Sequence, residues 1–429
     1  MCRASSLKQV WNLKRSRSSS ARQSVENSWI DQYILLALRM DRAFQAVDSS
    51  PFLDAYYGPP ELMRVCESEE PWTFSALAGQ AQSLQDQLEK EDFSPSRSQY
   101  LAKHVKSMET IARVRAGAEA PFFEIIENVL DIQPAWISES EFLEALAIMD
   151  QALPGRGDVR KRFQRWQKRA VFPADKPDEL LETLKIILAE ARKRTRQMIE
   201  LPENEEIEII PVRGVSYGAA NWYMGNYFSR MELNLDRPVY LFSLLYQLCH
   251  EAYPGHHTEF CCKEQHLFRE KGYLEQSVFF SLGPQLTIAE GIASLAMEMI
   301  FSPQEAATWI EEHILPFCKI KAREFDLALI LKAFTIASPD DMSSNMAQLI
   351  EVGRSFESVL DYARTYSPYS TEQISSLFPW LASPLSRLYA FTYSHGKRLL
   401  KPLIYGPEKN SYIRKLLTEQ VLPSTLSGY

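Results

Sequence analysis

The chain has 429 residues, of which 45% are hydrophobic and 24% charged, a composition typical of a soluble globular protein with a core large enough for one or two lobes. Its formal net charge of -8 argues against nucleic acid as a main partner, because phosphate binding needs a concentrated basic face. Six scattered cysteines form no disulfide framework and favour a reducing compartment, which we expect to be the cytoplasm. We expect no membrane span, since no segment approaches about 18 consecutive apolar residues. The oligomeric state is left open.

Residues 1–28 differ in kind from the rest of the chain. They are rich in serine and basic residues, and Glu26 is their only acid. This composition predicts a disordered basic tail. No apolar segment follows the basic residues as it would in a secretory signal.

Helical periodicity dominates from residue 29 onward. Apolar residues recur at intervals of three and four, which predicts a mainly α-helical protein with helices over residues 29–47, 74–88, 96–115, 178–200, 342–363 and 384–403. A soft boundary falls near residue 200, after the last helix of the first half. We therefore expect a helical N-terminal lobe over residues 29–200 and a catalytic, metal-binding lobe over residues 201–429.

Two stretches in the middle of the chain have the character of β-strands. Residues 205–212 are rich in strand-forming types, and residues 228–236 alternate polar with apolar side chains. They predict a small hairpin or sheet, joined by a loop of glycine and aromatic residues over 214–227. Such a strand could pair with an extended peptide substrate or could simply cover the core.

Residues 250–257 read His-Glu-Ala-Tyr-Pro-Gly-His-His and hold three of the seven histidines. Histidine nitrogens beside a carboxylate are ligands that zinc prefers, and the carboxylate can act on a water. The spacing is unusual, because zinc-binding histidines on one helix normally stand four residues apart. Here the second histidine follows His250 by six or seven residues, which an unbroken helix would place on another face or about 10 Å away.

A break in the helix would solve this problem of spacing. Pro254 lacks an N–H, its ring would clash with the carbonyl of His250, and Gly255 is free to take a positive φ. The break would bring His256 back beside His250, so we predict these two as metal ligands and hold His257 in reserve.

A third protein ligand is expected, with one position left open for water. Glu290 is the candidate, because it lies in an otherwise apolar helical stretch where a buried carboxylate needs a partner. Small neighbours, Gly291, Ala293 and Ala296, would let this helix approach the metal helix closely.

The catalytic roles follow from zinc chemistry. Glu251, next to a ligand but not ligating, would take a proton from water and pass it to the leaving group. The oxyanion needs a hydrogen-bond donor, for which Tyr393 and His395 in the C-terminal helix are the candidates. These features predict a zinc-dependent hydrolase acting on peptide or small peptide-like amide substrates.

The same motifs resemble those of the bacterial domain-of-unknown-function family 885, which is grouped with the zincin-like metallopeptidases. The resemblance implies a large helical zincin-like fold, a Zn²⁺ site from the paired histidines and the downstream glutamate, and peptidase activity. One departure is visible, since Ile292 stands where such proteins usually carry tryptophan. The resemblance is carried by residues 250–257, by Glu290-Gly291 followed by Ala293, by residues 54–60, and by residues 389–397.

Other functions fit the same residues. The metal could be structural, with Cys249, Cys261 or Cys262 closing the site as a fourth ligand. Histidine and carboxylate ligands also suit iron or manganese enzymes. A non-catalytic scaffold or binding protein is the third alternative, and a chance cluster at a kinked helix end is the fourth.

Overall fold

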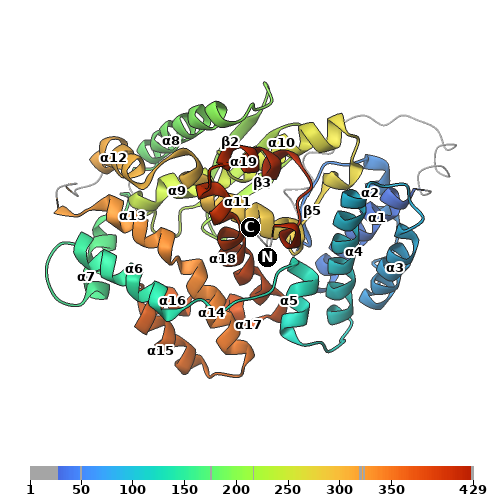
Figure 1. Ribbon diagram of the computed structural model, residues 1–429, viewed down its shortest axis with the longest axis horizontal. Coiled ribbons are helices and arrows are strands. Elements are labelled where there is room, and N and C mark those ends of the chain that lie inside the picture. The colour runs from blue at the N-terminus through green and yellow to red at the C-terminus, as the bar shows by residue number, and fades with distance from the viewer. Residues whose placement is uncertain are drawn as a thin grey trace.

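The computed structural model describes residues 28–48, 51–173, 176–215, 217–317, 321 and 324–426. The predicted tail, apart from Ser28, lies outside these residues. The fold is mainly helical, as predicted (Figure 1). Its α-helices are α1 (Trp29–Asp48), α2 (Pro60–Ser68), α3 (Phe74–Leu88), α4 (Pro95–Arg115), α5 (Phe122–Leu130), α6 (Glu139–Ala152), α7 (Val159–Arg169), α8 (Pro177–Met198), α9 (Leu241–Glu251), α10 (His256–Lys263), α11 (Pro284–Ile300), α12 (Pro303–His313), α13 (Leu327–Ile336), α14 (Pro339–Glu351), α15 (Phe356–Tyr366), α16 (Thr371–Ser375), α17 (Phe378–Ala382), α18 (Pro384–Tyr405) and α19 (Lys409–Thr418).

Most of the predicted helices are confirmed to within two residues at each end, and one prediction is wrong. The stretch 342–363 is two helices, α14 and α15, because the chain turns at Gly353 with a φ of 78°. Only glycine adopts that conformation without strain. The next helix then starts afresh, with the hydroxyl of Ser355 accepting a hydrogen bond from the backbone N–H of Ser358.

The two strand-like stretches form a sheet but not a hairpin. Strand β2 (Glu206–Val212) runs parallel to β4 (Phe228–Asn234), and a third strand, β3 (Ala219–Tyr223), pairs antiparallel with β4. The strand order is therefore β2-β4-β3. The prediction of a loop over 214–227 is wrong for residues 219–223, which form β3 although glycine and aromatic residues are frequent in this stretch. Because β3 packs against both α9 and α10, the sheet does lie beside the predicted metal helix.

A second, two-stranded sheet joins distant parts of the chain. Strand β1 (Leu53–Tyr56) pairs antiparallel with β5 (Val278–Phe280), with an irregularity in register between Leu53 and Ala55. Residues 54–60, one of the segments that carry the family resemblance, thus begin in a strand. This pairing ties the first helical segment to the region between α10 and α11.

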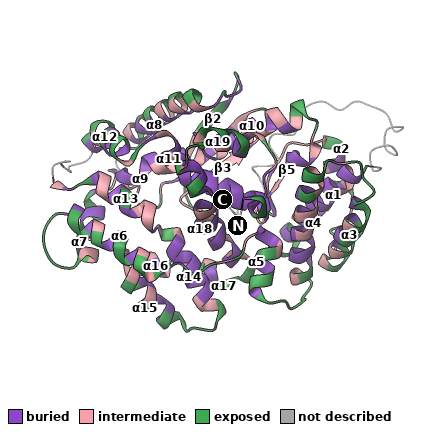
Figure 2. Ribbon diagram, viewed as in Figure 1, coloured by how far each residue is buried: buried purple, intermediate pink, exposed green. Residues whose placement is uncertain are grey.

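Helices α11 and α18 lie in the middle of the molecule (Figure 1), and α11 is buried along nearly its whole length (Figure 2). They pack on one another through Gly291 and Gly396. A Cβ atom added to Gly396 would come within 2.3 Å of the carbonyl oxygen of Thr287, and one added to Gly291 within 2.7 Å of the backbone of Gly396. The small residue at 291 therefore serves contact with α18, whereas the sequence suggested contact with the metal helix.

Buried side chains from both sides of residue 200 belong to one main core cluster, which runs from Trp29 to Leu426. Helix α13 of the second half, for example, packs on α6 of the first. Among the described residues, no single helix has the length and apolar composition to cross a membrane; α11 and α12, bent by 78°, pass that test only together. The described residues also form 3-10 helices at Leu274–Ser277, Leu315–Phe317 and Pro423–Thr425, and a π-helix at Glu264–Glu270.

Candidate metal centre

The helix that begins at Leu241 ends inside the histidine motif, as predicted. Helix α9 stops at Glu251, the Tyr253–Pro254 peptide bond is cis, and α10 begins at His256. The N–H of Gly255 donates back to the carbonyl of Cys249 at 3.0 Å. The break folds the chain tightly enough for two histidines six residues apart to meet.

Gly255 is required at the break for a reason other than the expected one. Its φ is -72°, not positive. A Cβ atom there would lie 1.9 Å from the carbonyl oxygen of His250, so no larger residue fits. The close backbone approach, not a left-handed conformation, selects glycine at this position.

Three of the predicted ligands converge. The Nε2 atom of His250 lies 3.4 Å, and that of His256 3.6 Å, from the same oxygen of Glu290, Oε2. One ligand atom from each residue falls within 4.8 Å of the other two. The two imidazole rings stand nearly perpendicular, with centroids 4.8 Å apart. The structure thus brings together a buried His-His-Glu group that could hold a metal ion.

The two oxygens of Glu290 have different surroundings. Oε1 accepts a hydrogen bond of 2.8 Å from the hydroxyl of Tyr389 on α18. Oε2, which faces both histidines, is buried and has no hydrogen-bond partner among the described residues. Tyr389 therefore fixes the orientation of the carboxylate and leaves one oxygen for a ligand, which is the usual task of a residue behind a metal ligand.

The charges in the group are strongly coupled. Burial opposes the charge of Glu290, but His256 and His250 outweigh burial and hold the pKa of Glu290 well below its usual range. Burial likewise opposes the charge of His256, but Glu290 raises the pKa of that histidine to about 9. A metal ion that bound here would replace the proton of His256 as the partner of the carboxylate.

His257, the reserve ligand, faces the other way. Its Nδ1 lies 2.8 Å from the hydroxyl of Ser229 and its Nε2 3.2 Å from Glu205 Oε2. Tyr253 also donates to this carboxylate, and Arg192 donates to its other oxygen. We call these four side chains of Glu205, His257, Tyr253 and Arg192 the closed cluster. The structure therefore brings His256, and not His257, together with His250 and Glu290.

Glu251 sits at the end of α9 beside the metal group. It is half-buried, and burial raises its pKa, with the two site histidines acting to lower the pKa and Glu290 to raise it. The side-chain amide of Asn221 in β3 donates to the backbone carbonyl of Glu251 at 2.8 Å. The small sheet thus holds the end of the metal helix.

Of the two predicted oxyanion donors, the structure brings only Tyr393 to the group. Its ring stacks on that of His250, with centroids 5.9 Å apart and planes at 24°. His395 lies two residues further along α18 and points elsewhere. Its Nε2 accepts a hydrogen bond from the backbone N–H of Ala135 at 2.8 Å, and its Nδ1 contacts the hydroxyl of Ser394 at 2.9 Å. With both ring nitrogens engaged, His395 has no N–H left for an oxyanion, and we do not carry it into the proposed mechanism.

Two further carboxyls act on the group and were missed by sequence reasoning. Asp54, at the irregularity in β1, has its pKa raised to about 7 by burial and then by the charge of Glu290. Asp340, in the first turn of α14, has its pKa raised to about 6 by burial and then by Asp341. Both come from elements far from the motif in sequence, and neither follows a ligand spacing.

The residues present fit a divalent metal with nitrogen and oxygen ligands, such as zinc. Among the residues that the structure describes, the group contains no cysteine, and Cys249, Cys261 and Cys262 are buried free thiols. A buried carboxylate oxygen without a partner is costly unless something binds it. The ligand set is that of a site with one position open, as a catalytic metal requires.

Comparisons with known proteins support the fold and nothing finer. No protein-family model and no curated protein sequence matches the chain. A solved structure described as "the putative lipoprotein from Colwellia psychrerythraea" has a similar fold, with a TM-score of 0.50 and 13% sequence identity; the match covers 86% of this chain and 68% of that one. The resemblance to family 885 rests on the motifs and stays a prediction.

Proposed function

We propose that the protein is a zinc-dependent hydrolase that cleaves peptide or peptide-like amide bonds. The observation that carries the proposal is the convergence of His250 and His256 on one oxygen of Glu290 that has no hydrogen-bond partner among the described residues. A second carboxylate, Glu251, is next in sequence to His250. A purely structural or scaffolding site has no need of that second acid.

His250, His256 and Glu290 would hold the ion. When bound there, zinc supplies Lewis acidity, which lowers the pKa of water and polarises a substrate carbonyl. Tyr389 keeps the glutamate oriented through its hydrogen bond. These roles account for every member of the group and for its immediate support.

Glu251 is the proposed general base. Burial raises its pKa, which moves this carboxylate toward the neutral range where a base accepts a proton and returns it most effectively. It would accept a proton from the attacking water and deliver it to the leaving nitrogen. The hydrogen bond from Asn221 to its backbone fixes the position from which it does so.

Tyr393 is the proposed donor to the oxyanion. The ring stacked on His250 holds the phenol beside the reacting centre. Burial and then the charge of Glu290 raise the pKa of Tyr393 well above its usual range, so its hydroxyl keeps the proton that it would donate. Preorganised donors of this kind contribute about 3 to 4 kcal/mol to transition-state stabilisation.

The test separates metal binding from catalysis. Glu251→Gln should retain stoichiometric zinc and lose about 10²- to 10⁴-fold in kcat, measured on a library of blocked peptides by mass spectrometry. Wild-type protein that holds zinc but cleaves no peptide would favour a scaffold, and iron or manganese in place of zinc would favour another class of metal enzyme. We further propose a reducing compartment such as the cytoplasm, which the four free cysteines of the described residues support.

A further inference from the structure

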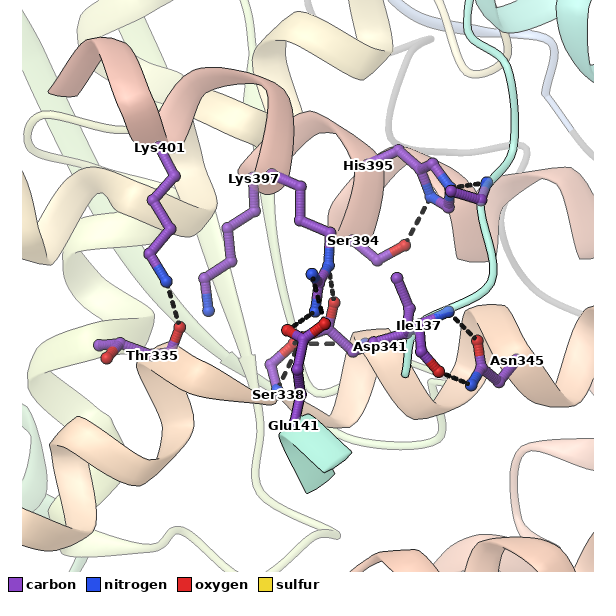
Figure 3. A network of polar contacts seen from close by, with 12 residues as sticks. Ile137, Glu141, Thr335, Ser338, Asp341, Asn345, Ser394, His395, Lys397 and Lys401 are labelled. Atoms are coloured by element: carbon purple, nitrogen blue, oxygen red, sulfur yellow. Dashed lines mark hydrogen bonds and ion pairs between the residues drawn. The ribbon is translucent and has the colours of Figure 1, made fainter. Parts of the chain in front are cut away.

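Helix α18 carries four polar side chains at intervals of four residues, so that each is a neighbour of the one before it on the helix surface, turned by about 40° around the axis. The first two belong to the metal centre, since Tyr389 donates to Glu290 and Tyr393 stacks on His250. The next two, Lys397 and Lys401, continue the same face beyond the centre. Figure 3 shows both lysines projecting from the same side of the helix.

Both lysines line a cavity of about 510 Å³. Its wall includes three basic side chains, those of Lys397, Arg398 and Lys401, and one acidic side chain, that of Asp341. Arg398 is neutralised, because its guanidinium pairs with Asp341 at 2.9 Å and with Glu141 at 2.8 Å. The positive charge that is available in the cavity therefore belongs to the lysines.

Each lysine has hydrogen-bonding capacity left over. Lys397 donates to the carbonyl of Phe334 at 3.1 Å, and Lys401 to that of Thr335 at 3.0 Å, both in the last turn of α13. An ammonium group has three donors. Neither lysine forms an ion pair with a carboxylate of the described residues, although Lys397 is only 7% exposed. A buried cation in this state favours an anionic ligand.

The surrounding charges agree with that conclusion. Burial, and then the positive charges of Lys397 and Arg398, lower the pKa of Lys401, against the opposing effect of Asp341 and Glu298, so an added anion would relieve repulsion between the two lysines. Two carboxyls, Glu298 on α11 and Asp340 on α14, interact with Lys397 at longer range. Burial raises the pKa of both, that of Asp340 to about 6.

We propose that Lys397 and Lys401 bind the C-terminal carboxylate of a peptide whose scissile bond lies at the metal centre, so that the protein cleaves close to a free C-terminus. This inference rests on the proposed hydrolase function and names its substrate class. It follows from the continuity of one helix face, with the groups proposed for chemistry at one end and unpaired ammonium groups at the other.

The helix sets the length of the segment that is released. Lys397 and Lys401 follow Tyr393 by roughly 6 and 12 Å along the axis, at 1.5 Å per residue. An extended peptide spans about 3.3 Å per residue, so the carboxylate would lie about two to four residues beyond the cleaved bond.

The experiment uses the zinc-loaded full chain and N-acetylated heptapeptides of randomised sequence, prepared once with a free C-terminal carboxylate and once as the amide. We expect the acids to be cleaved about 10- to 100-fold faster than the amides, as kcat/KM, the range that one charge-assisted contact supplies. The cuts in the acids should lie two to four residues from the C-terminus. Mass spectrometry reads both the rates and the positions.

Variants assign the preference to the lysines. Lys397→Gln and Lys401→Gln should raise KM for the acids, so that the ratio of acid to amide cleavage falls toward one. Lys397→Arg should restore part of the preference. Lys332→Gln is the control, because it removes an exposed lysine of α13 that does not line the cavity, and the ratio of acid to amide cleavage should not change. If the lysines only cap α13, the glutamine variants should unfold more easily than the wild type, and their ratio of acid to amide cleavage should stay the same.

Three results would overturn the proposal: equal cleavage of acids and amides by the wild type, cuts spread through the peptides, or cleavage of amides that requires an internal Asp or Glu. Failure of the hydrolase function would look different, since no peptide would be cleaved. In that case the Glu251→Gln protein loaded with zinc, titrated calorimetrically with the two libraries, still decides the matter. Tighter binding of the acids would support the carboxylate site, and equal binding would refute it.

Discussion

Two histidine–glutamate groups begin from adjacent residues of α10, and they differ in what they leave unsatisfied. In the closed cluster, both ring nitrogens of His257 and both oxygens of Glu205 have partners. In the metal group, one oxygen of Glu290 and the Nδ1 of His250 are buried without a hydrogen-bond partner among the described residues. The same residue types therefore build a structural support in one place and a candidate ligand site in the other. What marks the site is the unused hydrogen-bonding capacity rather than the presence of histidine and glutamate.

The strongest test of this difference between the two groups is to replace each of the adjacent histidines, His256 and His257, in turn. His256→Ala should abolish zinc binding, because two ligands remain from a group of three. His257→Ala should keep about one zinc per chain. Metal content by mass spectrometry after dialysis decides between them, and the reverse pattern would assign the site to His257.

The closed cluster should matter for stability instead. Glu205→Gln or His257→Ala leaves buried partners uncompensated, and we expect a loss of about 3 to 5 kcal/mol in the free energy of unfolding. Urea denaturation of the metal-free proteins measures it. Glu290→Gln is the matched change in the metal group and should destabilise the metal-free protein less. Equal losses would show that both groups are structural.

The scaffold histidines should also respond to pH. Burial lowers the pKa of His395 to about 4, from 6.5 in the unfolded chain. Between these values the unfolded state binds more protons, so stability falls as pH falls, by up to about 3 kcal/mol at pH 4. Protonation also removes the acceptor for the N–H of Ala135. His395→Gln should flatten this part of the pH profile of metal-free protein, and an unchanged slope would count against the assignment.

The smallest effect is expected for Tyr389, which contacts Glu290 from outside the metal group. Tyr389→Phe removes the hydrogen bond to Glu290 Oε1 and should weaken zinc binding by about 10- to 100-fold without abolishing it. Competition with a chelator of known affinity gives the value. Tyr362→Phe, which loses a hydroxyl bonded to Asn345 in another part of the protein, is the control and should leave zinc affinity unchanged.

Local sequence patterns predicted much of the fold and the three residues that converge in the candidate metal group. Apolar periodicity located most of the long helices, and the Pro254-Gly255 pair located the break that joins His250 to His256. Where the reasoning failed, the cause was long-range contact. The composition of β3 does not indicate a strand, because β3 is stabilised by its pairing with β4. The difference between His256 and His257 depends on Glu205 and Ser229, which are far away in sequence and contact His257. Asp54 and the hydrogen bond of Tyr389 likewise follow from packing that no single stretch of sequence reveals.

The contact between Gly291 and Gly396 has a consequence for protein engineering. Because backbone meets backbone there, the separation of α11 and α18 does not depend on any side-chain rotamer. Helix α11 carries Glu290, while α18 carries the two tyrosines and the two lysines. A designer who wished to transplant the centre would therefore have to move both helices as one rigid unit with both glycines kept, together with α9 and α10, which carry His250 and His256.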